Sequence, residues 1–277
     1  MLDGEGRMIL EVRKASFSYI PGFPIFEDIS FQMDEGDVFC ILGPNGIGKS
    51  TLIRCLARLS LLTSGCIHLQ GKDILTMNRQ DLAKKISFIP QIHSPSFSYT
   101  VFDFVLMGRN PYIGLFARPS EVDLSIAEDA IATVRISGLK EKKYTEISGG
   151  EQQLVVFAQA LAQEPKLLLL DEPTSHLDLA NQIHILKLID HLADKGLTTV
   201  MTTHIPDHAF LLERHAAIMK DGKFFALGPV HEVITEENMR EAYGVDVKIV
   251  NVDGTNQKTC VPVKNSPLPF EPGFALQ

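Results

Sequence analysis

Residues 43–50 read GPNGIGKS and match the pattern G-x-x-x-x-G-K-[ST]. The apolar run VFCIL precedes them and TLIRCLARL follows, which predicts a buried strand, a loop and a helix. Glycines let the backbone wrap closely around a phosphate, and the start of the helix adds partial positive charge there. The pattern therefore predicts a nucleotide site. The expected nucleotide contacts are Gly43, Pro44, Asn45, Gly46, Ile47, Gly48, Lys49, Ser50 and Thr51.

Two side chains of this loop suit a nucleotide with its metal ion. The Lys49 ammonium would reach the β- and γ-phosphates, and the Ser50 hydroxyl would hold Mg²⁺. The alternative is a structural glycine-rich turn, but the strand before the loop and the helix after it favour the nucleotide site.

Residues 167–172 read LLLLDE, so an apolar strand delivers two carboxylates at its carboxyl end. Ligands bind at that edge of an open α/β sheet. Asp171 is suited to bind Mg²⁺ through a water molecule, and Glu172 is suited to polarise an attacking water. Two solvated surface acids are the alternative, but the phosphate loop favours a metal-binding and catalytic pair.

Residues 147–151 read ISGGE and precede the helix-period run QQLVVFAQALA. Ser148 and Glu151 have the spacing of a capping box, which is one interpretation. The other uses the helix start and the N–H groups of Gly149 and Gly150 as a site for a γ-phosphate. One ATP does not need two such cradles from a single small domain. The second interpretation therefore predicts a symmetric dimer, in which each chain completes the partner's site.

The ordered set GPNGIGKS, Gln91, ISGGE, LLLLDE, SHLD and His204 resembles the nucleotide-binding subunit of an ABC transporter over residues 8–250. The resemblance implies an α/β fold, the P-loop NTPase ABC ATPase fold, with an antiparallel β subdomain and a helical insertion subdomain. Strand-like alternation at the start of the chain predicts the antiparallel part, and KISFIPQ predicts a strand ending on Gln91. Broken helical patterns place the insertion at about residues 95–163, and residues 251–277 form a C-terminal extension.

The resemblance also implies roles for single residues. Tyr19 would stack on adenine, Gln91 would ligate Mg²⁺, Asp178 would lie at the dimer seam, and His204 would touch the γ-phosphate. The alternatives are a partly buried strand aromatic for Tyr19, a polar loop residue for Gln91 and a solvated side chain for His204. The histidines expected only at the surface or in packing are His68, His93, His176, His184, His191, His208, His215 and His231.

Composition and charge exclude several classes of protein. The chain has 277 residues with a formal net charge of −8, and this acidic balance argues against nucleic acid as a partner. No run approaches the ~20 apolar residues of a membrane-spanning helix, and the N-terminus lacks a secretory layout. The four cysteines show no C-x-x-C pair. We therefore expect a soluble, reduced, cytosolic protein.

Two regions narrow the resemblance to importers. SYTVFDFVLMGRNPYIGLFARPSEVD and ALGPVHEVITEENMREAYGVDV look like subunits that drive uptake of ferric siderophores, haem, cobalamin, or molybdate and tungstate. This implies a homodimer on the cytoplasmic face of the membrane, bound to a separate permease dimer and acting indirectly with an external substrate-binding protein. The alternatives are a cytosolic ABC ATPase with soluble partners, as in iron–sulfur cluster assembly, and the ATPase of an exporter.

Two local features leave questions for the structure. The signature-like ISGGE is followed by Gln152 where a basic residue is common, so we expect weak ATP-driven dimer closure. An apolar loop either packs on the helices of the insertion or helps to form a groove for a permease helix. Its residues are Tyr112, Ile113, Leu115 and Phe116.

Overall fold

The strand that leads into residues 43–50 lies inside a six-stranded central sheet. Its strands are, in sheet order, β10 (Lys223–Pro229), β9 (His215–Lys220), β3 (Val38–Leu42), β8 (Thr198–Thr202), β7 (Leu167–Leu170) and β6 (Ile86–Ile89). Neighbouring strands are parallel except for the β9–β10 hairpin. The computed structural model describes residues 7–91, 99–114, 116–175, 177–255 and 257–263.

Both faces of the central sheet are buried, which explains the uninterrupted apolar runs of β3 and β7. Leu168 and Leu170 join one core cluster, whereas Leu167 and Leu169 join the other. One face carries α5, α6 and α7, and the other carries α1 and a separate antiparallel sheet. The bounds of these helices are α1 (Lys49–Leu56), α5 (Gly149–Ala162), α6 (Leu179–Asp194) and α7 (Pro206–Leu212).

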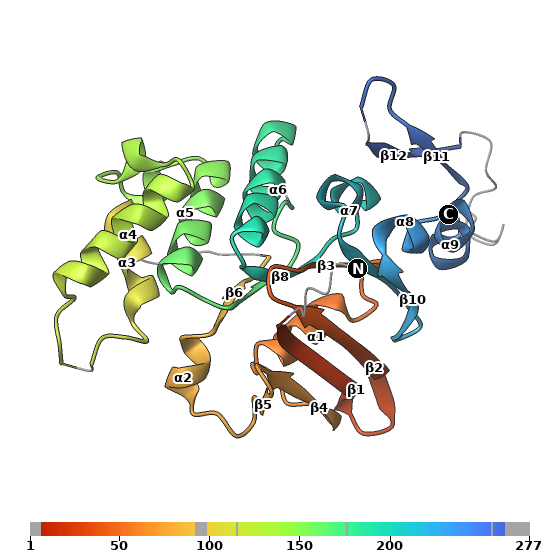
Figure 1. Ribbon diagram of the computed structural model, residues 1–277, viewed down its shortest axis with the longest axis horizontal. Helices are drawn as coiled ribbons and strands as arrows, with labels where there is room; N and C mark the ends of the chain where they lie inside the picture. Colours follow the sequence, from red (N-terminus) through yellow and green to blue (C-terminus); the bar gives the residue numbers. More distant parts are fainter. Residues whose placement is uncertain (1–6, 92–98, 115, 176, 256, 264–277) are drawn as a thin grey trace, which may run out of the picture.

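The predicted antiparallel part is confirmed as a four-stranded sheet below the central sheet in Figure 1. Its strands are, in sheet order, β2 (Phe23–Asp34), β1 (Met8–Ile20), β4 (Ser64–Leu69) and β5 (Lys72–Asp73). Phe31 of β2 stacks on Phe39 of β3 with ring centroids 4.7 Å apart. This contact fastens the antiparallel sheet to the strand that precedes the phosphate loop.

The helical character predicted for the insertion is confirmed, and its helices form a helical group at one end of the molecule (Figure 1). The group consists of α3 (Val101–Leu106), α4 (Glu121–Thr133), α5 and the short turns η1 (Met107–Arg109), η2 (Ser137–Leu139) and η3 (Tyr144–Glu146). Residues 95–98, where the insertion was expected to begin, lie outside the described residues.

A buried arginine ties the helical group together. The Arg109 side chain donates from Nε to Asp123 Oδ1 at 3.0 Å and from Nη1 to Glu164 Oε2 at 2.8 Å. Its guanidinium lies 4.0 Å from the ring centroid of Tyr112. A charge that is only 4% exposed needs such partners, and these join the end of α3 to α4 and to the segment after α5.

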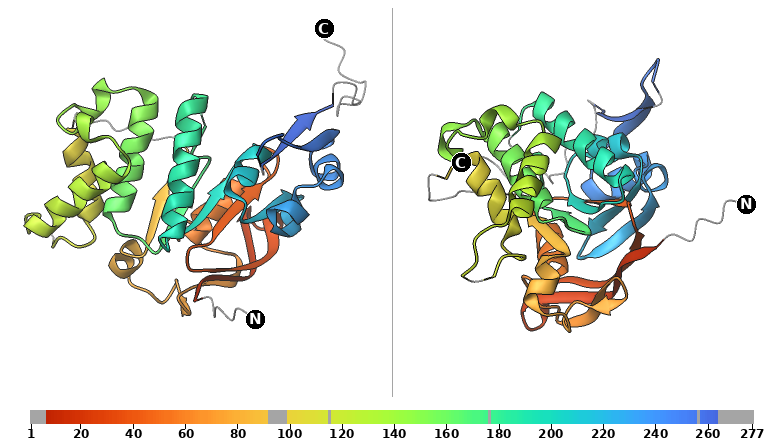
Figure 2. Two further views of the ribbon diagram at one scale, coloured as in Figure 1. Left: turned by 45° about the horizontal axis from the view of Figure 1, so that its top comes forward. Right: turned by 60° about the vertical axis from the view of Figure 1, so that its left-hand side comes forward.

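The chain ends in two small helices and a C-terminal ribbon, which Figure 2 shows at the end of the molecule opposite the helical group. The bounds are α8 (Val230–Val233), α9 (Glu236–Tyr243), and the ribbon strands β11 (Val247–Asn251) and β12 (Lys258–Pro262). Asp221 and Gly222 form the turn of the β9–β10 hairpin, with φ angles of +47° and +72°. The ribbon joins residues on both sides of position 251, where the extension was expected to begin.

Some details differ from the sequence prediction. The strand predicted to end on Gln91 ends at Ile89, because Pro90 has no N–H group for the sheet. The short helices α2 (Arg79–Ala83), α7 and α8 were not predicted.

In the part of the chain that the structure describes, no helix combines the length and apolar character required to cross a membrane.

Candidate nucleotide-binding site

A cleft of about 520 Å³ opens above the phosphate loop. It lies where β3, β7 and β8 end, because parallel strands deliver the residues that follow them to one edge of the sheet. Its lining residues are Tyr19, Ile25, Asn45, Gly46, Gly48, Lys49, Ser50, Thr51, Gln91 and Glu172. The structure thus brings together Tyr19, the phosphate loop, Gln91 and Glu172, which lie far apart in the sequence.

The shape of the phosphate loop depends on glycine. Gly43 has φ +150°, and a Cβ atom there would lie 2.6 Å from the carbonyl oxygen of Met219. Gly48 has φ +109° and forms the N-cap of α1 without a side-chain bond, so the first N–H groups of α1 are left available to a ligand. The loop can therefore hold an anion with backbone groups alone.

Lys49 is held inside this loop. Its Nζ donates to the carbonyl oxygens of Gly43 at 2.7 Å and Pro44 at 3.0 Å. Burial lowers the pKa of Lys49, and the nearby carboxylates of Glu172 and Asp171 act in the opposite direction. An ammonium that is 5% exposed and 4.0 Å from Glu172 Oε1 is well placed to pair with a phosphate.

The residues expected to hold Mg²⁺ adjoin one another. Ser50 Oγ donates to Asp171 Oδ1 at 2.9 Å, although the two residues are 121 positions apart. Mg²⁺ prefers oxygen ligands and is commonly held by one or two carboxylates together with phosphates. A hydroxyl and a carboxylate beside a phosphate loop fit this ion, and Gln91 adds an amide at the same cleft.

Three polar side chains near the cleft, those of Gln91, His204 and Ser175, contact Glu172. Its Oε2 lies 3.3 Å from Gln91 Nε2, 3.3 Å from His204 Nδ1 and 3.0 Å from Ser175 Oγ. Its backbone has φ +48°, a left-handed conformation that is strained for a residue other than glycine. A carboxylate held in this way at the mouth of the cleft can orient a water molecule for attack.

A hydroxyl that the sequence analysis overlooked supports both carboxylates. Thr202 Oγ1, at the end of β8, donates to Asp171 Oδ1 and accepts the backbone N–H of Glu172. Ser175 was quoted only as the first residue of the SHLD motif and was given no role, although its hydroxyl donates to Glu172. A threonine that ends a buried strand two residues before His204 is the signal that was available.

Tyr19 lies near the end of β1, is 63% exposed and lines the cleft. Phe17 holds it in an edge-to-face contact with centroids 4.7 Å apart. The alternative of a partly buried strand aromatic does not fit this exposure. An exposed ring beside a phosphate loop offers a face on which a base can stack.

The ISGGE segment stands apart from this cleft. Ser148 caps α5 and forms the capping box with Glu151, whose pKa is lowered by the backbone and side-chain hydrogen bonds from Ser148. Among the described residues, none of residues 148–151 lines the cleft. Gly150 instead packs against Asn181, and Asn181 bonds to Asp178, the N-cap of α6. Both interpretations of ISGGE are therefore compatible with the structure.

Two further expectations can be compared with the structure. Tyr112 packs on the helical group, since its hydroxyl donates to the Gln163 carbonyl at 3.1 Å, whereas Phe116 is 96% exposed. Of the histidines given no role, His208 is buried and bonded to Thr203. Leu115, His93 and His176 lie outside the described residues.

Known proteins resemble the chain along most of its length. A family model described as ABC transporter matches residues 26–175. The iron(3+)-hydroxamate import ATP-binding protein of Bacillus subtilis is 34% identical over 238 residues, which cover 86% of this chain and 88% of that protein. The molybdate import ATP-binding protein of Haemophilus influenzae is 37% identical over 231 residues, with 83% and 86% covered.

A solved structure gives the same result. An inward-facing metal-chelate type ABC transporter matches with a TM-score of 0.82 and 32% identity, covering 93% of this chain and 98% of that one. The match to the family model spans both the phosphate loop and the paired carboxylates. The chain belongs to the ABC transporter family and is one of its ATP-hydrolysing subunits.

Proposed function

We propose that this chain powers an importer for a metal chelate or a metal oxyanion, as a dimer bound to a separate membrane permease. The cargo classes are iron–siderophore complexes, haem, cobalamin and molybdate or tungstate. The relatives named for iron(3+)-hydroxamate and molybdate import support this, as does the metal-chelate type transporter. In this proposal the chain lies on the cytoplasmic face of the membrane and acts on an external substrate-binding protein only through the permease.

One observation carries the proposal of a dimer. The cleft has a phosphate cradle on one side only, and residues 148–151, which form the start of α5, do not line it. Ser148 and Gly149 are exposed, so a second chain can meet them. Two chains related by a twofold axis would place each α5 start on the partner's nucleotide.

Each residue of the cleft then has a proposed task. Tyr19 stacks on adenine, and Lys49 with the loop N–H groups binds the phosphates. Ser50, Asp171 and Gln91 hold Mg²⁺, which supplies charge stabilisation for phosphoryl transfer.

The catalytic group is proposed at the mouth of the same cleft. Glu172 orients water for in-line attack, and His204, 3.3 Å from it, stabilises the charge at the γ-phosphate. Ser148, Gly149, Gly150 and Glu151 act in trans, and Asp178 lies at the seam.

A groove lined in part by Pro90, the residue before Gln91, suits the permease. It has a volume of about 350 Å³ and lies between β6 and the helical group. Its lining residues are Ser87, Phe88, Pro90, Met107, Gly108, Asn110, Pro111, Val156, Gln159, Ala160 and Gln163. Gln91 follows Pro90 directly and bonds to Glu172, so a permease helix in the groove would be one residue away from the catalytic cleft.

The proposal is tested by recovery of partners. The tagged chain is isolated from detergent-solubilised membranes of its host, and co-purifying proteins are identified by mass spectrometry. A multi-span permease is the expected partner, and its genetic neighbours would narrow the cargo. Recovery of soluble proteins alone would contradict the importer and favour the cytosolic ATPase.

A pair of variants tests the groove within the same experiment. Asn110→Arg places a charge at the exposed rim of the groove and should abolish recovery of the permease. Asn251→Arg makes the same change on the ribbon at the opposite end of the molecule and should leave recovery unchanged. Equal recovery with both variants would contradict the groove as the permease site.

A further inference from the structure

The C-terminal ribbon is fastened to the segment that carries His204. Oδ1 of Asp207 accepts the backbone N–H of Cys260 at 2.8 Å, and Oδ2 accepts the hydroxyl of Thr259 at 3.1 Å. Asp207 is the second residue of α7 and follows His204 by three positions. A ribbon from the end of the chain thus holds the first turn of the helix that begins at the catalytic cleft.

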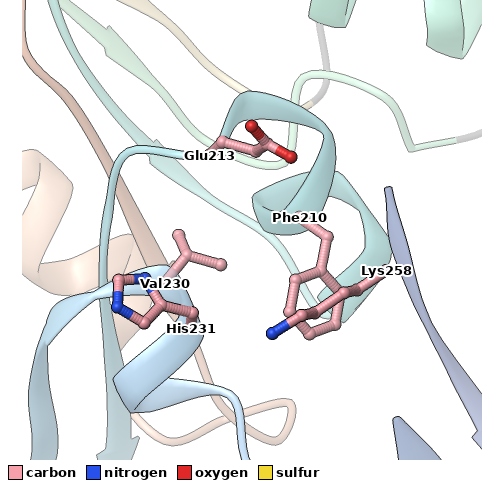
Figure 3. A pocket seen from close by; sticks show the side chains of 5 residues that line it. All are labelled: Phe210, Glu213, Val230, His231 and Lys258. Atoms are coloured by element: carbon pink, nitrogen blue, oxygen red, sulfur yellow. The ribbon is translucent and has the colours of Figure 1, made fainter. Parts of the chain in front are cut away.

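Beyond that turn the ribbon stands away from α7. A hollow of about 270 Å³ separates β12 from α7 and α8, as Figure 3 shows. Phe210 of α7, Glu213 just after that helix and His231 of α8 line it, while Lys258 of β12 reaches in alongside the ring of Phe210. Among the described residues, the side-chain hydrogen bonds between α7 and the ribbon are therefore those of Asp207.

The segment between His204 and Asp207 is stiff. Thr203 Oγ1 accepts the N–H of Ile205 at 3.1 Å and lies 2.9 Å from the ring nitrogen Nδ1 of His208. His208 is 5% exposed, so its ring is fixed by packing. A shift of the first turn of α7 would consequently be passed to the backbone of His204.

His204 itself has few restraints of its own. Its side chain is 47% exposed, and its Nδ1 lies 3.3 Å from Glu172 Oε2. The orientation of such a side chain depends on the backbone that carries it, and misplacement of a reacting group by 1 Å can lower a rate by about 10²-fold.

We infer that Asp207 is a positioning residue for ATP hydrolysis: it uses the C-terminal ribbon to hold the His204 segment against Glu172. The inference rests on the role proposed above for His204. Breaking the link should slow the chemical step, while ATP binding should persist because none of the described residues of β12 lines the cleft.

Steady-state ATPase measurements on the full chain test this. Asp207→Ala removes both acceptors and should lower kcat about tenfold with KM for ATP within about twofold. Asp207→Asn keeps an oxygen that can accept the Cys260 N–H, so it should restore most of kcat. Thr259→Val removes only one of the two bonds and should fall between the wild type and Asp207→Ala. Thermal unfolding of each variant confirms that it is folded.

A double-mutant cycle separates positioning from general destabilisation. In the His204→Ala background, Asp207→Ala should have no further effect on kcat. Wild-type kcat in Asp207→Ala, or an equal further loss in the His204→Ala background, would overturn the inference. Normal turnover of His204→Ala alone would instead contradict the proposed role of His204, which is a separate result.

Discussion

The hydroxyl of Thr202 lies 2.8 Å from Oδ1 of Asp171, inside the sheet edge that forms the cleft. The same hydroxyl accepts the backbone N–H of Glu172 at 2.9 Å. Ser50 also donates to this carboxylate oxygen. The Thr202 side chain thus orients both Asp171, the proposed metal ligand, and Glu172, the proposed catalytic base. The strained backbone of Glu172 is held in part by this hydrogen bond.

Replacement of Thr202 by valine should therefore impair both folding and catalysis. Thr202→Val leaves the Glu172 N–H without its acceptor, and a buried unpaired polar group costs about 1–3 kcal/mol. We expect kcat to fall at least about tenfold, because Glu172 loses a restraint. Unfolding in urea and ATPase assays measure the two effects.

Thr199→Val is the matched control for this substitution. Thr199 is also buried in β8, but its hydroxyl has no partner among the described residues. Its replacement should leave kcat unchanged and should leave the free energy of unfolding equal or higher, since no hydrogen bond is lost. Similar losses of kcat in both variants would show that the Thr202 hydroxyl has no special part.

His208 should make the fold sensitive to mild acid. Burial lowers the pKa of His208 to about 4, with a smaller contribution from His204 and an opposing one from Asp207. The unfolded chain has a histidine pKa near 6.5 and binds the proton first, so the free energy of unfolding falls as the pH drops below about 6.5 and levels off below about 4. From pH 7 to pH 5 this one group should account for about 2 kcal/mol.

Denaturant unfolding at pH 7 and pH 5 tests this assignment. His208→Asn can still bond to Thr203 but does not titrate, so the loss between the two pH values should shrink by about 2 kcal/mol. His231→Asn removes an exposed histidine and should not alter the loss. An unchanged pH dependence in His208→Asn would show that other groups cause the acid sensitivity.

The close approach of η1 to α5 predicts a steric effect. A Cβ atom on Gly108 would lie 2.2 Å from the backbone oxygen of Gln159, which has no freedom to move away. Gly108→Ala should lower the free energy of unfolding by about 1–3 kcal/mol. Gly138→Ala, where a Cβ meets nothing within 4 Å, should change it by less than about 0.5 kcal/mol. Equal stability of the two variants in urea would disprove this packing.

Gln152 gives a prediction about dimer closure. Its amide donates to the carbonyl oxygens of Tyr144 and Ile147, beside the start of α5, and it carries no charge. Gln152→Arg should lower the ATP concentration for half-maximal turnover by roughly fivefold, equivalent to about 1 kcal/mol of attraction to the partner's nucleotide. The effect should fade at high salt. An unchanged ATP concentration for half-maximal turnover would show that the missing charge at position 152 does not weaken dimer closure.

The sequence predicted the elements with strong local signals. Residues 43–50 carry their chemistry in consecutive positions, and the run LLLLDE combines a buried strand with the two acids that follow it. The short helix α7 was missed, although Pro206 at its first position is a start signal. Seven residues give too few turns for a periodic pattern to be recognised.

Contacts between distant residues were beyond the sequence. Thr202 and Asp171 are 31 positions apart, and Asp207 and Cys260 are 53 apart. A threonine in a buried strand has many possible partners, and only the sheet order places it beside one carboxylate. The sequence predicted the capping box at Ser148. It did not predict how far Ser148 lies from the cleft, because this distance depends on how the helical group packs.

The central claim is that two chains complete each ATP site, and sedimentation velocity of Glu172→Gln tests it most directly. This variant should bind ATP and hardly hydrolyse it, because the group that orients water is lost. With saturating ATP and Mg²⁺ the account predicts a sedimentation coefficient of a dimer, and without nucleotide that of a monomer. A monomer at saturating ATP would contradict the account.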